Sequence, residues 1–254
     1  MPDEESRVRR ATRFYLRKVN RAVSHYGLIE PGDRIAVAVS GGQDSLALLR
    51  LLRERPAFFP PPYELVAIHV FYRGLEAAVP PREVLEAHLR GEGVPYSLVE
   101  VDLTGEEVSC FRCSWLRRKA LFGRAQELGC NKLALAHHLE DIVETTLLNL
   151  FQHGRLERPE PCSPLFGGRL VLIRPLVFLT AHELHRYARL CGLPVYESNC
   201  PHGRTSERAR LRACLRELHK ARAELYINVF RAVEKQAAGR SRAARDDRCA
   251  RGAS

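Results

Sequence analysis

Apolar residues follow two patterns that alternate along most of this chain. Short runs of β-branched and small apolar residues are typical of buried strands, whereas apolar positions three or four residues apart predict amphipathic helices. Strands that alternate with helices favour an α/β fold, a parallel twisted sheet with helices on both faces. The predicted strands are residues 34–39, 64–70, 96–101, 132–136 and 170–173, and the predicted helices are residues 8–26, 45–55, 81–92, 114–128, 140–151, 181–190 and about 205–236.

The turn after the first predicted strand carries the clearest chemical signal. Residues 40–45 read Ser-Gly-Gly-Gln-Asp-Ser, and the helical pattern begins at Ser45. A strand, a glycine turn and a helix N-terminus form an anion cradle, because backbone N–H groups and the helix dipole converge there. The hydroxyls of Ser40 and Ser45 add donors. The turn is neither a Walker loop nor Gly-x-Gly-x-x-Gly. It resembles the pyrophosphatase loop of PP-loop enzymes, which split ATP between its α- and β-phosphates and adenylate a substrate oxygen.

Length and composition bound the domain organisation. With 254 residues, 45% of them hydrophobic, the chain can form a large α/β domain with a small appendage. We expect an N-terminal helical segment at 1–30, an ATP-binding α/β domain at 31–195, a helical region at 196–237 and a disordered basic tail at 238–254. No apolar run approaches the ~20 residues that span a bilayer, and the N-terminus has no apolar signal core. We therefore expect a cytoplasmic protein with no membrane partner.

The chain is strongly basic. Its 40 Lys and Arg residues exceed its 30 Asp and Glu residues, which gives a net charge of +10. Such an excess predicts a polyanionic partner. Nucleic acid is favoured over a membrane, because no amphipathic segment is expected to combine bulky aromatic residues with a basic face.

Two of the eight cysteines, Cys110 and Cys113, have C-x-x-C spacing at the mouth of a predicted helix. The helix dipole favours thiolate, and the spacing lets both sulfurs reach one metal centre. A redox dithiol, half a zinc site and an iron–sulfur ligand pair are the candidates. A thioredoxin-type dithiol is disfavoured, because such a pair opens the helix after the first strand of its own fold. No second C-x-x-C completes a zinc site, so the pair needs a distant cysteine. Cys200, in a turn between two helical segments, is the best candidate.

Residues 136–141, Ala-His-His-Leu-Glu-Asp, end the fourth predicted strand and open the next helix. Polar groups at the carboxyl end of a strand suit a nucleotide or metal site. By themselves His137 and His138 would be two ordinary histidines in a βα loop. Only the presence of the glycine turn in the same chain favours a functional role for them.

In order and spacing these segments resemble the tRNA 2-thiocytidine synthetase family of PP-loop sulfur-transfer enzymes over about residues 10–235. The matching pieces are residues 30–34 leading into 40–45, the run from Cys110 through Cys113 to the Leu-Arg-Arg at 116–118, residues 135–141, the Ile-Arg-Pro-Leu at 173–176, and Cys200.

The resemblance implies an adenine-nucleotide α-hydrolase-like fold and a tRNA sulfurtransferase of ATP-pyrophosphatase type. The C2 oxygen of a tRNA cytidine, in the anticodon loop, would attack the α-phosphate of ATP, and sulfur would then replace the adenylated oxygen. A [4Fe–4S] cluster on three cysteines would keep one iron open to carry the sulfur. The resemblance also implies Mg²⁺ as a cofactor and a cysteine desulfurase or sulfide as the sulfur donor. It further implies a homodimer.

The resemblance also assigns roles to residues of this chain. The expected catalytic residues are Asp44, Cys110, Cys113 and Cys200, of which the three cysteines hold the cluster. Asp44 or Asp141 would serve Mg²⁺. The expected ATP contacts are Ser40, Gly41, Gly42, Gln43, Asp44, Ser45, His69, Ala136, His137 and Asp141. The expected contacts to RNA or phosphate are Arg117, Arg118, Lys119 and Arg174, although an exposed solvated face explains the first three equally well.

Three departures from the family pattern bear on the substrate. Gln43 stands where the family usually has Lys, which removes a cation near the phosphates. Leu139 and Glu140 replace the Arg-Asp of the family's histidine motif, so a second cation is lost. The segment before Cys110 is shorter than typical and carries two glutamates. These changes leave the expected fold and cluster intact.

Three alternatives stay open. The first is a PP-loop enzyme that acts on another tRNA base or catalyses an amidation-like transfer, although the latter has no need of three cysteines. A zinc-stabilised RNA-binding protein with an inactive loop would bind zinc through Cys110, Cys113, Cys200 and His202. A desulfidase would use a similar cluster without ATP.

Overall fold

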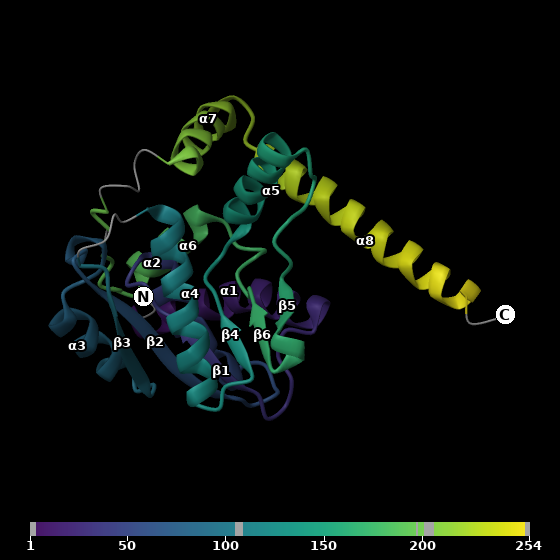
Figure 1. Cartoon of the computed structure of the whole chain (residues 1–254). Coiled ribbons are helices and arrows are strands. Elements are labelled where there is room, and N and C mark those ends of the chain that lie inside the picture. The colour runs from purple at the N-terminus through teal and green to yellow at the C-terminus, as the bar shows by residue number, and fades with distance from the viewer. Residues whose placement is uncertain (1–3, 105–108, 197, 201–205, 252–254) are drawn as a thin grey trace. The chain divides into compact units, whose positions relative to one another are not determined.

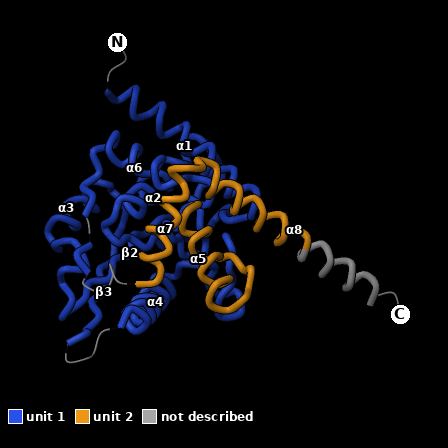
Figure 2. The backbone as a smooth tube through the Cα atoms, turned by 90° about the horizontal axis from the view of Figure 1, so that it is seen from above, with its two compact units in different colours: residues 1–138, 160–205 blue, residues 139–159, 206–254 orange. Residues whose placement is uncertain are grey.

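A computed structural model of the chain describes residues 4–104, 109–196, 198–200 and 206–251, with side chains up to residue 239 (Figure 1). The chain forms two compact units (Figure 2). Unit 1 comprises residues 1–138 and 160–205, and unit 2 comprises residues 139–159 and 206–254. In the described part of the chain, no helix combines the length and the apolar character needed to cross a membrane.

Unit 1 is built on a six-stranded sheet with the strand order β3-β2-β1-β4-β6-β5. All neighbouring strands run parallel except β5, which pairs antiparallel with β6 at one edge. The strand order reverses direction at β1, so the turn after β1 lies where ligands bind in open parallel sheets. The strands are β1 (Arg34–Ala38), β2 (Glu64–Arg73), β3 (Tyr96–Asp102), β4 (Lys132–Ala134), β5 (Cys162–Leu165) and β6 (Leu170–Ile173).

Helices cover both faces of this sheet, as Figure 1 shows. On one face α1, α2 and α6 pack against one another, and on the other face α4 crosses β2, β3 and β4. Both faces are buried, which explains the nearly continuous apolar runs in β1 and β2. The helices of unit 1 are α1 (Glu4–Tyr26), α2 (Gln43–Glu54), α3 (Arg82–Glu92), α4 (Cys110–Glu127) and α6 (Ala181–Leu190), with short 3₁₀ turns η1 (Arg55–Ala57), η2 (Glu76–Ala78) and η3 (Phe166–Gly168). The predicted parallel α/β fold is confirmed.

Unit 2 consists of α5 (Leu139–His153), α7 (Glu207–Ala221) and α8 (Leu225–Arg251). Tyr226, Phe230 and Val233 are buried at helical spacing along the first half of α8, so a single face of this helix makes the contacts. Helix α8 ends at Arg251, and the disordered basic tail expected from residue 238 stays a prediction.

The division into units also differs from the predicted domain boundaries. Residues 4–26 form α1, which packs on α2 and α6 and therefore belongs to the sheet unit rather than to a separate segment. Residues 139–159 leave the sheet unit and join α7 and α8. Apolar residues of α5 and α8 contact each other across a long sequence separation, which a local pattern does not reveal.

Candidate active site

The turn between β1 and α2 is organised by the hydroxyl group of Ser45. This hydroxyl donates to the carbonyl oxygen of Gly42 (2.8 Å) and accepts from the backbone N–H of Ser40 (3.1 Å). The Ser40 and Ser45 hydroxyl oxygens are 3.1 Å apart. Since Ser45 has one hydroxyl proton and it points at Gly42, this side chain shapes the loop, while backbone N–H groups at the first turn of α2 are the natural anion donors.

Gly41 meets two conditions that a side chain would break. Its φ is +88°, in the left-handed region that favours glycine. A Cβ atom at this position would lie 2.6 Å from Cγ of Pro80. The loop is therefore held closely against the segment that leads into α3.

The side chains of Gln43 and Asp44 turn in different directions from the first turn of α2. The Oε1 atom of Gln43 lies 3.0 Å from Nδ1 of His185 on α6. One carboxylate oxygen of Asp44 lies 3.6 Å from Nε2 of His138, at the end of the loop that follows β4. The structure thus brings the predicted histidine segment to the glycine turn. His185 was not predicted, because an isolated histidine on an exposed helix face carries no sequence signal.

His69 is a buried residue of β2 whose Nδ1 lies 2.6 Å from the carbonyl oxygen of Val39, just before the turn. Burial lowers the pKa of His69 to about 4, so the ring is neutral at pH 7. A neutral ring that donates through Nδ1 leaves a lone pair on Nε2, which is buried without a hydrogen-bond partner among the described residues. His69 therefore supports the backbone from which the turn starts, and its predicted contact with ATP stays a prediction.

Arg174, which follows β6, is occupied by protein groups. Its guanidinium donates to Nδ1 of His137 (3.0 Å), to the backbone carbonyl of Glu160 and to the hydroxyl of Ser163 (3.4 Å). Burial lowers the pKa of the Arg174 guanidinium from its ordinary value. These contacts orient His137 near the end of β4, and a direct phosphate contact of Arg174 stays a prediction.

Ala136 lies between β4 and α5 in unit 1, whereas Asp141 belongs to unit 2. There the carboxylate of Asp141 lies 3.5 Å from Arg212 and 3.9 Å from Arg208. These observations do not test the predicted nucleotide contacts of Ala136 and Asp141, which stay predictions.

The three predicted cysteine ligands lie together in unit 1. Cys110 is exposed at the start of α4, where Ser109 caps the helix by accepting from the backbone N–H of Arg112. Cys113 is half-buried one turn later, and Cys200 is half-buried on the segment that follows α6. Burial raises the pKa of the Cys113 thiol, and the nearby Cys200 and Cys110 thiols add to this rise.

Two further side chains act on Cys113. The nearby Tyr72 hydroxyl and the charge of Arg117 both lower the pKa of the Cys113 thiol, against the effect of burial. The Tyr72 hydroxyl is itself buried without a hydrogen bond of ordinary geometry to any described residue. Tyr72 ends up next to the cysteines because it lies near the carboxyl end of β2, beneath α4. The sequence hint would have been its position at that end of a strand, but a tyrosine there is too common to single out.

Three thiols are the donor set that a [4Fe–4S] cluster with one open iron requires, so they fit such a cluster in kind. Within the described residues, no three side chains of Cys, His, Asp or Glu are grouped closely enough to hold a metal ion. His202, the fourth ligand of the zinc alternative, lies outside the described residues.

The segment that carries Cys200 is tied to the glycine turn. The backbone N–H of Tyr196 donates to the carbonyl oxygen of Gly41 (3.1 Å), and the Tyr196 hydroxyl donates to that of Ala77 (3.2 Å). The Ser198 hydroxyl donates to the carbonyl oxygen of Ala78 (2.9 Å). Hydrogen bonds therefore connect the anion cradle and the cysteines through about four residues of chain.

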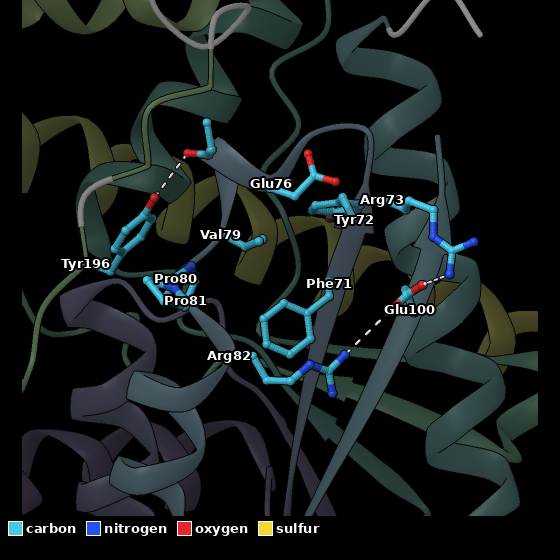
Figure 3. Close-up of a pocket in the computed structure, with 11 residues that line it drawn as sticks. Phe71, Tyr72, Arg73, Glu76, Val79, Pro80, Pro81, Arg82, Glu100 and Tyr196 are labelled. Carbon is cyan, nitrogen blue, oxygen red and sulfur yellow. Dashed lines mark hydrogen bonds and ion pairs between the residues drawn. The ribbon is translucent and has the colours of Figure 1, made fainter. Parts of the chain in front are cut away.

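A cleft of about 540 Å³ opens beside these elements (Figure 3). Its wall includes Tyr72, which contacts Cys113, and Pro80 and Tyr196, which contact Gly41. Arg82 lies over the ring of Phe71, 4.5 Å from its centroid, and 3.6 Å from Glu100. The cleft thus adjoins both the glycine turn and the cysteines, and it offers aromatic faces and charged groups to a ligand.

Comparison with known proteins agrees with this geometry. The family of PP-loop domains matches residues 12–218 of the chain. A tRNA-cytidine(32) 2-sulfurtransferase of Geobacter sulfurreducens is 39% identical over 85% of this chain and 86% of its own length. The chain belongs to this family. The predicted resemblance is therefore confirmed, and the assignment of the PP-loop to the turn at residues 40–45 stays a prediction.

Other relatives of the PP-loop sulfurtransferase family are longer. A tRNA-cytidine(32) 2-sulfurtransferase of Neisseria meningitidis serogroup C is 40% identical over 71% of this chain, which spans 58% of that relative. One of Alkalilimnicola ehrlichii is 39% identical over 84% of this chain and 70% of its own length. The solved structure of the U34-tRNA thiolase NcsA from Methanococcus maripaludis, which has a [4Fe-4S] cluster, covers 89% of this chain with a TM-score of 0.71 and 22% identity. That similarity extends over 78% of the NcsA chain and supports the fold.

Proposed function

We propose that this protein is an ATP-dependent tRNA sulfurtransferase that thiolates C2 of a cytidine, as the names of its relatives suggest. The observation that carries the proposal is the connection, through Tyr196, between the PP-loop and the segment that bears Cys200. The glycine turn and the three cysteines belong to one unit, and a cleft lined by Tyr72, Pro80 and Tyr196 lies beside them. This is the arrangement that an enzyme needs if it activates a base with ATP and then delivers sulfur to it.

The PP-loop would bind the phosphates of ATP through backbone N–H groups at the start of α2. The C2 oxygen of cytidine would attack the α-phosphorus, the bond to the bridging oxygen would break, and pyrophosphate would leave. The carboxylate of Asp44, which is partly exposed beside the turn, suits Mg²⁺ bound to these phosphates. Sulfur would then replace the adenylated oxygen at C2, and AMP would leave.

Cys110, Cys113 and Cys200 would hold a [4Fe–4S] cluster. Such a cluster, with an iron that lacks a protein ligand, supplies a site that carries sulfur. The protein's own part is to keep the thiols deprotonated and close to the base, and Arg117 favours the thiolate of Cys113 through its charge. Sulfide or a cysteine desulfurase would supply the sulfur, and we propose a cytoplasmic homodimer as the working unit.

The first experiment is anaerobic purification followed by analysis of iron, sulfide and zinc and by a visible spectrum. We expect about four irons and four sulfides per chain and absorption near ~400 nm. Cys200→Ser should lose them. Cys214→Ser, which removes an exposed cysteine from α7 in unit 2, is the matched control and should keep them. Stoichiometric zinc without iron would instead support the zinc-stabilised protein.

The second experiment incubates the protein with unmodified tRNA, ATP and sulfide and analyses the nucleosides by mass spectrometry. We expect 2-thiocytidine and one AMP per sulfur. Sulfur removal without ATP would identify a desulfidase, and sulfur on a different base would correct the substrate. Gly41→Ala should abolish thiolation while the iron content stays unchanged, because the PP-loop and the thiols are separate parts of the site.

A further inference from the structure

Helix α4 exposes two aromatic side chains beside the cysteines. Phe111 is 75% exposed, which makes it the most exposed large hydrophobic side chain in the described part of the chain, and Trp115 is 43% exposed. They are four residues apart, so they lie next to each other on one face of the helix. Cys110, also exposed, directly precedes Phe111. Water-exposed rings of this size are costly to the isolated protein and indicate a surface that binds a partner.

The partner is indicated by the charges around the rings. The guanidinium carbon of Arg112 lies 5.8 Å from the centroid of the Trp115 ring, and Nζ of Lys119 lies 5.4 Å from it. Arg118 is exposed on the same helix. From Cys110 to Gln126 the helix contains no acidic residue. This finding corrects our expectation that no segment combines bulky aromatic residues with a basic face.

Aromatic faces flanked by cations bind single-stranded nucleic acid, because each base can stack on a ring while the cations contact phosphates. Duplex RNA hides its bases within the stack and offers no face to such a ring. The surface therefore favours unpaired nucleotides. It lies at the cysteines, where the proposed function requires an unpaired cytidine of tRNA to arrive.

We propose that Phe111 and Trp115 form a stacking platform for unpaired bases of the RNA substrate, next to the base that is thiolated. Arg112, Arg118 and Lys119 bind the phosphates of the same nucleotides. This inference rests on the proposed function, and it adds the part of the protein that holds the substrate loop.

The chain offers a direct probe of this platform, because Trp115 is its single tryptophan. Titration with a hairpin that contains the tRNA anticodon loop should quench the Trp115 fluorescence. A fully paired duplex of the same stem should quench it much less at equal salt. Higher salt should weaken binding of both RNAs, since each phosphate contact releases counterions.

Variants separate stacking from charge. Phe111→Ala and Trp115→Ala should each weaken binding of a dye-labelled hairpin about tenfold, as expected for the loss of one stacked base. Trp115→Phe, which keeps a ring, should restore most of the affinity. Phe151→Ala removes a ring that is 69% exposed on α5 in unit 2 and should leave the affinity unchanged.

Each other outcome has a definite meaning. If both alanine variants bind the hairpin as tightly as the wild type, the platform is wrong, while thiolation by the wild type still supports the proposed function. If the wild type binds no RNA, both proposals fail. If vesicles with anionic lipid quench Trp115 and the hairpin does not, the surface binds a membrane and the platform is again wrong.

Discussion

The guanidinium Nε of Arg174 donates a hydrogen bond to Nδ1 of His137 over 3.0 Å. Since Nδ1 accepts, a neutral His137 ring carries its proton on Nε2. The half-buried Arg174 therefore acts as a positioning residue for one edge of the predicted nucleotide site.

Replacing Arg174 tests this relationship. Arg174→Met should free Nδ1 of His137, so that ¹⁵N NMR shows a mixture of both tautomers, and the KM for ATP should rise about tenfold. Arg169→Met removes an exposed guanidinium whose one hydrogen bond among the described residues is to the carbonyl oxygen of Phe166, and it should change neither. An unchanged imidazole spectrum in Arg174→Met would contradict the assignment.

Gly41 allows a second test, because Gly32 has a similar backbone conformation but has space for a Cβ atom. Gly41→Ala combines a left-handed φ of +88° with a Cβ that meets Pro80, whereas Gly32 has a φ of +81° and nothing within 4 Å. Gly32→Ala should cost only the backbone strain, about 1 kcal/mol of unfolding free energy. Gly41→Ala should cost clearly more in urea denaturation and should also abolish ATP binding in calorimetry. If both variants lost the same unfolding free energy, the contact between the added Cβ and Pro80 would be relieved by a small shift of the loop.

The burial of His69 predicts a dependence of stability on pH. The pKa of His69 is lowered to about 4 from an ordinary 6.5, so the unfolded chain binds the proton more readily than the folded one. Its contribution is therefore complete above pH 6.5 and falls as the pH drops towards 4, by about 3 kcal/mol in all. His69→Gln should flatten the decrease in unfolding free energy between pH 7 and pH 5. Equally steep decreases in both proteins would contradict this account.

The sequence predicted the parts of the fold whose pattern is local. Strand β1, the PP-loop and α2 were recognised nearly to the residue, because an apolar run, two glycines and a helical period follow one another without ambiguity. Strand β5 was missed, since four residues that include Pro164 carry no alternation, and proline is tolerated only because this is an edge strand. The start of α4 at Cys110 depends on the Ser109 cap, whereas the apolar pattern began four residues later.

The sequence indicated the residue types of the candidate site, but not the side chains that hold these residues in place. The cysteines and glycines can be recognised from residue type and spacing. Tyr72 and Tyr196 act through tertiary contacts between distant segments, which a local pattern does not indicate. An arginine after a strand does not reveal that donors of the half-buried Arg174 are used by the Glu160 carbonyl and by His137.

Unit 2 offers a test of its own in the pair formed by Glu144 and Arg212. The Glu144 side chain is 2% exposed, and the guanidinium of Arg212 donates to both of its oxygens at 2.7 Å. Arg212→Met leaves a buried carboxylate without its cation and should lower the unfolding free energy by about 3 kcal/mol. Amide exchange in α5 and α7 should accelerate in parallel.

A control and a double variant decide whether the effect belongs to the buried charge. Lys220→Met breaks the Lys220–Glu217 pair on the same helix, whose side chains are both 71% exposed, and should change little because exposed pairs are screened by water. Glu144→Leu combined with Arg212→Met removes both charges and should recover most of the stability, since an apolar pair has no ion to desolvate. If the double variant were as unstable as Arg212→Met alone, the loss would come from packing of the Arg212 stem and not from an uncompensated carboxylate.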